Sequence, residues 1–264
     1  MKEYYFLASL LPSLEIGHVP SLGFKELKTL LEANLNDQDK IRTRRFLRLI
    51  DLENLRAYWA QEPFDPRGNV GLEAMEQALA TAQWPVGEEF APFLQDYLDK
   101  YTSNEERLKY FPFLMSTFFQ RISEEEHGFL KDYFAFQREM RLVMVGFRAK
   151  RLGKNLDVEL QYEDATDPVV AQILAQKDAK VYEPPFEYKE LKPIFEEFID
   201  SPIDLYKTVY EYQFNHIIEL WGGELFTIDR ILTYMARLIL VERWLELDMQ
   251  KGIAVLDEIE RNIG

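Results

Sequence analysis

Residues 129–152 read FLKDYFAFQREMRLVMVGFRAKRL, and Gly153 follows them. Apolar side chains recur through this stretch at spacings of three and four residues, which is the period of one face of an α-helix. A glycine directly after such a pattern is a common C-terminal stop. The stretch therefore predicts one long helix that ends near residue 152. Its apolar stripe consists of Phe129, Leu130, Tyr133, Phe134, Met140, Val143, Met144 and Phe147.

The same periodicity continues on both sides of this stretch and predicts an all-α, multi-helical fold. Short strands at residues 4–10 or 157–162 remain an alternative. The apolar stretch before Pro12 superficially resembles a signal peptide, but Glu3, Pro12 and the lack of a cleavage site favour a short buried segment at residues 4–11. No Ser- or Gly-rich linker divides the chain, so a single helical domain over residues 1–264 is expected. Further helices are predicted over residues 24–35, 41–59, 202–221 and 228–250, with a break at Gly252.

Three capping patterns set the starts of helices. Ser103 with Glu106 and Ser123 with Glu126 both have the spacing of a capping box. Asp167 precedes Pro168, which is the order of an N-cap residue followed by proline in the first turn. We therefore expect helices to begin after residues 103, 123 and 167.

The composition narrows the possible functions. The chain of 264 residues carries 31 Lys plus Arg against 46 Asp plus Glu, a net charge of −15, which argues against a nucleic-acid-binding surface. It has no Cys and only three His, so thiolate metal sites and Cys nucleophiles are excluded. No apolar run approaches the ~18 residues that cross a bilayer. We expect a cytoplasmic protein without direct membrane insertion.

A short pattern recurs three times on predicted long helices. The copies start at Arg48, Arg141 and Arg237, which are 93 and then 96 residues apart. Five-residue matches of common helix residues also arise by chance, so both a threefold repeat and a coincidence are open. A repeat would divide the chain into pseudo-repeats at 1–100, 101–180 and 181–264.

Around these copies the chain resembles the C subunit of V-type and archaeal-type rotary ATPases. The similar residues are Asp51-Leu-Glu53-Asn54-Leu55-Arg56, Glu139 through Gly153, and Met235 through Gly252. The second and third segments lack the Asn-Leu pair of that family. The resemblance implies three helical units arranged as a funnel or socket. It also implies a non-catalytic coupling role between central-shaft and membrane-ring subunits, peripheral to the membrane, with no cofactor.

Chemical motifs give one alternative to this interpretation. Glu124-Glu125-Glu126-His127 contains Glu-x-x-His, whose spacing places two metal ligands on one helical face. A helical-bundle metal enzyme or carrier using Glu124 and His127 is therefore the second hypothesis. No second Glu-x-x-His occurs, no P-loop motif is present, and N-terminal capping explains the three glutamates.

Two basic clusters stand out in this acidic chain. They are either solvated helix faces or docking patches for an acidic partner, because Arg side chains concentrate binding energy at interfaces. Basic residues near 148–151 also suit the negative end of a helix. The candidate partner-binding residues are Arg42, Arg44, Arg45, Arg48, Arg148, Lys150 and Arg151.

Overall fold

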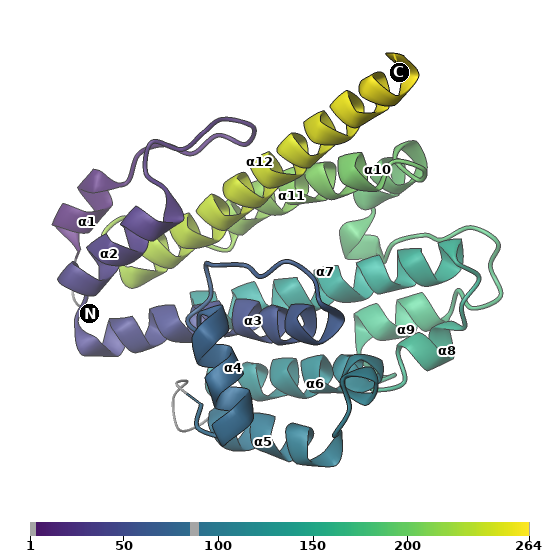
Figure 1. Cartoon of the computed structure of the whole chain (residues 1–264), viewed down its shortest axis with the longest axis horizontal. Helices are drawn as coiled ribbons and strands as arrows, with labels where there is room; N and C mark the ends of the chain where they lie inside the picture. Colours follow the sequence, from purple (N-terminus) through teal and green to yellow (C-terminus); the bar gives the residue numbers. More distant parts are fainter. Residues whose placement is uncertain (1–3, 85–89, 264) are drawn as a thin grey trace. The chain divides into compact units, whose positions relative to one another are not determined.

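Long α-helices make up most of the chain, as the apolar periodicity predicts (Figure 1). The computed structural model describes residues 4–84 and 90–263, and side chains for 4–84 and 92–251. The described residues form twelve α-helices and one 3₁₀-helix, with no β-strand among them. The all-α class is therefore confirmed. The strand alternatives are wrong, because helices α1 (Tyr5–Leu10) and α8 (Leu156–Glu159) occupy those stretches.

The chain divides into two compact units. Unit 2 is continuous and spans residues 28–125, whereas unit 1 combines residues 1–27 with 126–264. Unit 1 is therefore built from two separated stretches of sequence. The pseudo-repeat bounds at 1–100, 101–180 and 181–264 do not coincide with this division and stay a prediction.

Unit 2 is centred on two long antiparallel helices that pack along each other, α3 (Asp37–Ala60) and α6 (Asn104–Glu125). Its largest fully buried side chains include Leu52 and Leu55 on α3 and Leu114 and Phe118 on α6. Burial of such side chains is the main stabilising contribution to a helix pair. The remaining helices of this unit are most of α2 (Phe24–Asn34), α4 (Leu72–Thr81) and α5 (Phe90–Lys100).

In unit 1 the quoted stretch forms α7 (Phe129–Arg151), which contacts α8, α9 and α12. Gly153 adopts φ +65°, and the Lys154 amide donates to the Ala149 carbonyl, so the predicted C-terminal stop is confirmed. The other helices of this unit are α9 (Pro168–Leu174), η1 (Phe186–Tyr188), α10 (Leu191–Glu197), α11 (Pro202–Glu219) and α12 (Ile228–Ile263).

Helices α11 and α12 lie side by side as an antiparallel hairpin (Figure 1). Three cation–π contacts join α12 to α11 and to Trp221, two residues past the end of α11, and successive contacts are seven residues apart on both sides. This spacing is the heptad repeat, which keeps one seam of each helix facing the other. The contacts are Lys207 over Trp244 at 3.8 Å, Arg237 over Phe214 at 3.8 Å, and Arg230 over Trp221 at 4.9 Å.

The capping predictions have mixed outcomes. The Glu106 amide donates to Ser103 Oγ at 3.1 Å and the Ser103 amide to Glu106 Oε2 at 3.3 Å, so that capping box is confirmed. Asp167 accepts from the Val169 amide at 3.0 Å, which confirms the N-cap. The second box is wrong: α6 continues through Ser123, whose hydroxyl donates to the Gln120 carbonyl inside the helix. The expected break at Gly252 is also wrong, since α12 continues to Ile263.

A buried carboxylate and an amide on α3 hold the loop that follows this helix. Asp51 Oδ1 accepts from the backbone amides of Asn69 at 2.7 Å and Val70 at 3.1 Å. The Asn54 side chain bonds both the amide and the carbonyl of Asp65 at 2.8 Å. Burial raises the pKa of Asp51 and outweighs the lowering effect of the hydrogen bonds that it accepts from Asn69 and Val70. Two residues of the motif that suggested a rotary-ATPase component are therefore loop anchors.

The connection between α9 and η1 is held against α7 by Tyr182. The Tyr182 hydroxyl donates to the Val143 carbonyl at 3.0 Å, and the ring reaches this carbonyl by passing Gly146. A Cβ on Gly146 would lie 2.7 Å from Tyr182 Oη. The glycine inside α7 is thus explained by close approach of a side chain, at the usual cost in helix propensity.

Candidate functional site

Large apolar side chains are exposed where α1 meets the start of α12. Phe6 is 63% exposed, Leu225 56% and Tyr5 55%, although these residues belong to ordered segments in contact. Contiguous exposed apolar groups on a folded domain mark interaction sites more often than isolated ones do. We call the five residues that share this position the α1 surface: Tyr5, Phe6, Leu10, Leu225 and Phe226.

Local contacts fix the α1 surface in place. The Tyr4 amide donates to the Phe226 carbonyl at 2.6 Å, and the Tyr5 and Phe226 rings lie 4.4 Å apart. Leu7 points the other way and is buried. Phe6 and Leu10 are four residues apart and share one face of the helix. The exposed side chains are therefore presented by an anchored helix and not by a free chain end.

This surface corrects the expectation that residues 4–11 are buried. Only Leu7 of α1 is buried, because a helix of six residues turns neighbouring side chains to different sides. Helical spacing is the sequence signal for the surface: Phe6 and Leu10 are one turn apart, and Leu7 lies on another face. A uniformly apolar stretch hides this signal, since buried and exposed positions carry the same residue types.

The first predicted basic cluster does not act as one surface. Arg44 is exposed and Arg45 is half-buried, whereas Arg48 is only 7% exposed and lies within the buried part of α3. Arg42 lies 3.9 Å from Asp39 on the preceding turn. Only part of the cluster is therefore accessible to a partner, and its role in binding stays a prediction.

The second basic cluster lies at the end of α7 in unit 1. Lys150 donates to the carbonyls of Lys177 at 2.6 Å and Ala179 at 2.8 Å, which fixes the end of the segment after α9. Arg148 bonds the Met144 carbonyl and contacts Tyr206, and Arg151 lies 3.6 Å from Asp200. These side chains thus have structural contacts, and partner binding by them stays a prediction.

The premise of the metal alternative is wrong. Helix α6 ends at Glu125 and α7 begins at Phe129, so Glu124 and His127 do not lie on one helical face. Among the described residues, no three His, Asp or Glu side chains gather as a bound metal ion requires. The end of α6 lies between Glu124 and His127, the two residues whose spacing suggested metal ligands.

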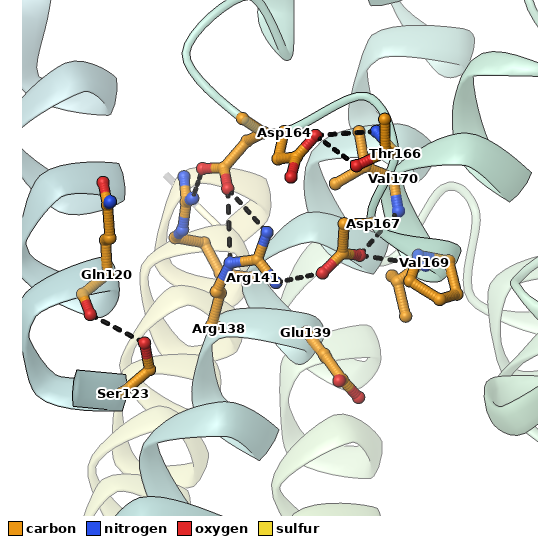
Figure 2. Close-up of polar contacts among 12 residues, drawn as sticks. Gln120, Ser123, Arg138, Glu139, Arg141, Asp164, Thr166, Asp167, Val169 and Val170 are labelled. Carbon is orange, nitrogen blue, oxygen red and sulfur yellow. Dashed lines mark hydrogen bonds and ion pairs between the residues drawn. The ribbon is translucent and has the colours of Figure 1, made fainter.

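A half-buried ion-pair cluster ties the loop before α9 to the middle of α7. Figure 2 shows Arg138 and Arg141 of α7 together with Asp167 at the start of α9. Arg138 lies 3.0 Å from Glu163 and 2.9 Å from Asp167, and Arg141 pairs with the other oxygen of Glu163. Burial alone lowers the pKa of Arg138, but Asp167 and Glu163 outweigh it and raise the pKa. Burial lowers the pKa of Arg141.

Each guanidinium group of this cluster faces a carboxylate, and the Nε of Arg141 is a buried donor that makes no hydrogen bond. Ion pairs that are largely removed from water fix geometry more than they add net stability. The only sequence signal for the cluster is that Arg138 and Arg141 are three residues apart and so share one side of α7. Its acidic partners lie 22 to 29 residues further along the chain and carry no distinguishing pattern.

Comparison with known proteins places the chain among its relatives. The model of the family described as "Protein of unknown function (DUF2764)" matches residues 1–263. The chain belongs to this family. It is 32% identical over 264 residues to uncharacterized proteins of Chlamydia muridarum and Chlamydia pneumoniae, and 30% identical over 265 residues to one of Chlamydia trachomatis. Each match covers 100% of the chain and 99% of the relative. No solved structure matches.

The family match overturns the resemblance to the C subunit of rotary ATPases. Family membership over the whole chain is a stronger statement than three short segments, and the matched family is a different one. Asp51 and Asn54, which carried the first segment of that resemblance, are explained by loop anchoring. In the described part of the chain, no helix is both long and apolar enough to span a membrane.

Proposed function

We propose that the chain is a non-catalytic component of a protein assembly and that the α1 surface is the place where a partner protein docks. The observation that carries the proposal is the exposure of five large apolar side chains on an anchored helix and on the segment that its Tyr5 ring contacts. Exposed apolar area of this kind is unfavourable in water and becomes favourable when a partner covers it.

The residue types of this surface support a protein partner. Tyr and Phe are enriched among residues that dominate binding energy, because they bury a large area with few rotatable bonds. The bond from Tyr4 to Phe226 and the burial of Leu7 hold α1 before any partner arrives. Less conformational entropy is then lost on binding.

Photo-crosslinking tests this proposal in the intact protein. Benzoylphenylalanine in place of Phe6 is expected to form a covalent adduct with a partner in cells of the native organism. The matched control carries the same group in place of Val19, which is 83% exposed. Val19 is two residues from Gly17, and Gly17 packs on Trp244. Along α12, Trp244 lies about 24 Å from Ile228, the first residue of the helix.

A single adduct from position 6 and none from position 19 supports the proposal, provided that the purified partner binds Phe6→Ser at least tenfold more weakly. No adduct from either position contradicts it. The shaft and ring subunits of a rotary ATPase, predicted as partners from the sequence, are identified or excluded by the mass of the adduct. They stay a prediction until that measurement.

A further inference from the structure

One face of α12 carries three hydrogen-bond donors in a row. Arg230, Tyr234 and Arg237 are four and then three residues apart, so they share one side of the helix. The Arg230 guanidinium lies over Trp221 and the Arg237 guanidinium over Phe214, both on the segment that forms and follows α11. A guanidinium stacked on a ring keeps its edge N–H groups available for a planar or tetrahedral oxyanion.

These donors lack acceptors. Neither Tyr234 Oη nor Arg237 Nε has a hydrogen-bond partner, although both atoms are buried. Among the described residues, no carboxylate forms an ion pair with Arg230 or Arg237, in a chain that has 46 Asp plus Glu. Buried donors without partners cost free energy, and they are rare enough in folded proteins to need an explanation.

The electrostatic surroundings of this face are positive. Burial lowers the pKa of Arg237, and the nearby charge of Arg230 lowers it further. Arg230 lies in the first turn of α12, where the free amides of the helix end already favour an anion over a cation. Burial raises the pKa of Tyr234 to about 12, so at neutral pH its hydroxyl is protonated and able to donate.

We propose that Arg230, Tyr234 and Arg237 form a binding site for the phosphate group of a small molecule. Two guanidinium groups call for a doubly charged anion, and a phosphate dianion neutralises both, whereas a carboxylate neutralises one. The third donor, Tyr234 Oη, belongs to a residue on the same side of α12 and would receive its missing acceptor. Because Tyr234 Oη and Arg237 Nε are buried in this structure, neighbouring side chains have to move when the anion enters.

Isothermal titration of the full chain with inorganic phosphate tests the site. Binding is expected for the wild type, and Arg237→Gln is expected to weaken it at least tenfold. Arg56→Gln is the matched control, since Arg56 is an exposed arginine paired with Glu62, and it should leave the dissociation constant unchanged. Equal affinity of Arg237→Gln and the wild type overturns the proposal, as does absence of binding to the wild type at about 50 mM phosphate, a concentration well above the Kd of a specific site.

Tyr234→Phe separates binding from folding. The variant removes a hydroxyl that has no acceptor, so the midpoint of urea unfolding without phosphate should not fall, while the affinity for phosphate should fall several-fold. Unchanged affinity removes Tyr234 from the site and contradicts the three-residue assignment. Tighter binding of acetate than of phosphate, at matched ionic strength, contradicts the choice of anion.

Phosphate also stabilises proteins by exclusion from their surface, without a site. A stabilisation by phosphate that persists unchanged in Arg237→Gln has that origin and counts against the proposal. A stabilisation that is present in the wild type and Arg56→Gln but absent in Arg237→Gln supports it.

Discussion

Single residues in this chain hold loops by satisfying backbone groups that would otherwise be buried without partners. Asp51 accepts hydrogen bonds from two consecutive backbone amides. The Asn54 side chain accepts from the Asp65 amide and donates to the Asp65 carbonyl. The cost is a carboxylate kept away from water, which appears as the raised pKa of Asp51. Loop position and acid–base behaviour are therefore linked at one side chain.

Replacing Asp51 tests this link. Asp51→Ala leaves the Asn69 and Val70 amides without an acceptor and is expected to lower the free energy of unfolding by about 3 kcal/mol. Urea denaturation followed by circular dichroism measures the change. Glu76→Ala, on the exposed side of α4, is the control and should stay within about 0.5 kcal/mol.

The raised pKa of Asp51 predicts the direction of a pH effect. A carboxyl whose folded pKa lies above its ordinary value of 3.8 is penalised when ionised, so protonation stabilises the fold. The stability of the wild type relative to Asp51→Asn should therefore rise as the pH falls from about 7 toward about 4. A difference between the two proteins that is constant over this range, in urea denaturation, would contradict the raised pKa.

Gly146 provides the second test at this scale. Gly146→Ala should gain up to about 1 kcal/mol of helix propensity but place Cβ against Tyr182, so a net loss of about 1–2 kcal/mol is expected. Gly222→Ala, where a Cβ meets nothing within 4 Å, should be close to neutral. In a Tyr182→Ala background the Gly146→Ala change should become neutral or stabilising; a loss of the same size there would exclude the steric cause.

At the scale of elements, the loop between α8 and α9 is joined to α7 through Glu163. Glu163→Gln removes the carboxylate that two half-buried guanidinium groups share and should lower the free energy of unfolding by about 2 kcal/mol. Asp200→Asn removes the exposed partner of Arg151 and should cost less than about 1 kcal/mol. Thermal or urea unfolding measures both changes. Equal losses of stability in the two variants would show that the Glu163 ion pairs stabilise the fold no more than an exposed pair does.

The sequence predicted elements well where a local pattern determines them. The long apolar stripe of α7, the box at Ser103 and the N-cap at Asp167 were all recognisable, because their partners lie within a few residues. The box at Ser123 failed because α6 continues past it, and packing of Phe118, Phe119 and Ile122 in the core outweighs the local capping preference. Gly252 likewise did not end α12.

The candidate sites were less predictable than the helices. The α1 surface depends on which side of a short helix meets a segment more than 200 residues away. The face of α12 with Arg230, Tyr234 and Arg237 depends on Phe214 and Trp221, because the rings of these two residues outside the helix position the guanidinium groups. Positive charge in the sequence pointed to residues 42–48 and 148–151, but burial and internal contacts, which decide availability, are properties of the fold.

At the scale of the whole molecule, unit 2 has its own core and a continuous sequence. A fragment of residues 22–125, which keeps all of α2, is expected to show an α-helical circular dichroism spectrum and cooperative unfolding. It loses the bond from the Phe24 amide to Glu242, so its stability should be lower than that of the full chain. Asp51→Ala in the fragment is the control for native structure and should lower its midpoint; a random-coil spectrum of the fragment would contradict independent folding.

The interrupted sequence of unit 1 also has a consequence for synthesis on the ribosome. Helix α1 is made before the segment it contacts, because the Phe226 carbonyl that accepts from Tyr4 follows more than 200 residues later, about 10–40 s at ordinary elongation rates. All of unit 2 emerges in the meantime. During this interval the residues of the C-terminal part of unit 1 that bury Leu7 are not yet made. The apolar side chains of α1 are then exposed to chaperones, including Leu7, which is buried in the folded protein.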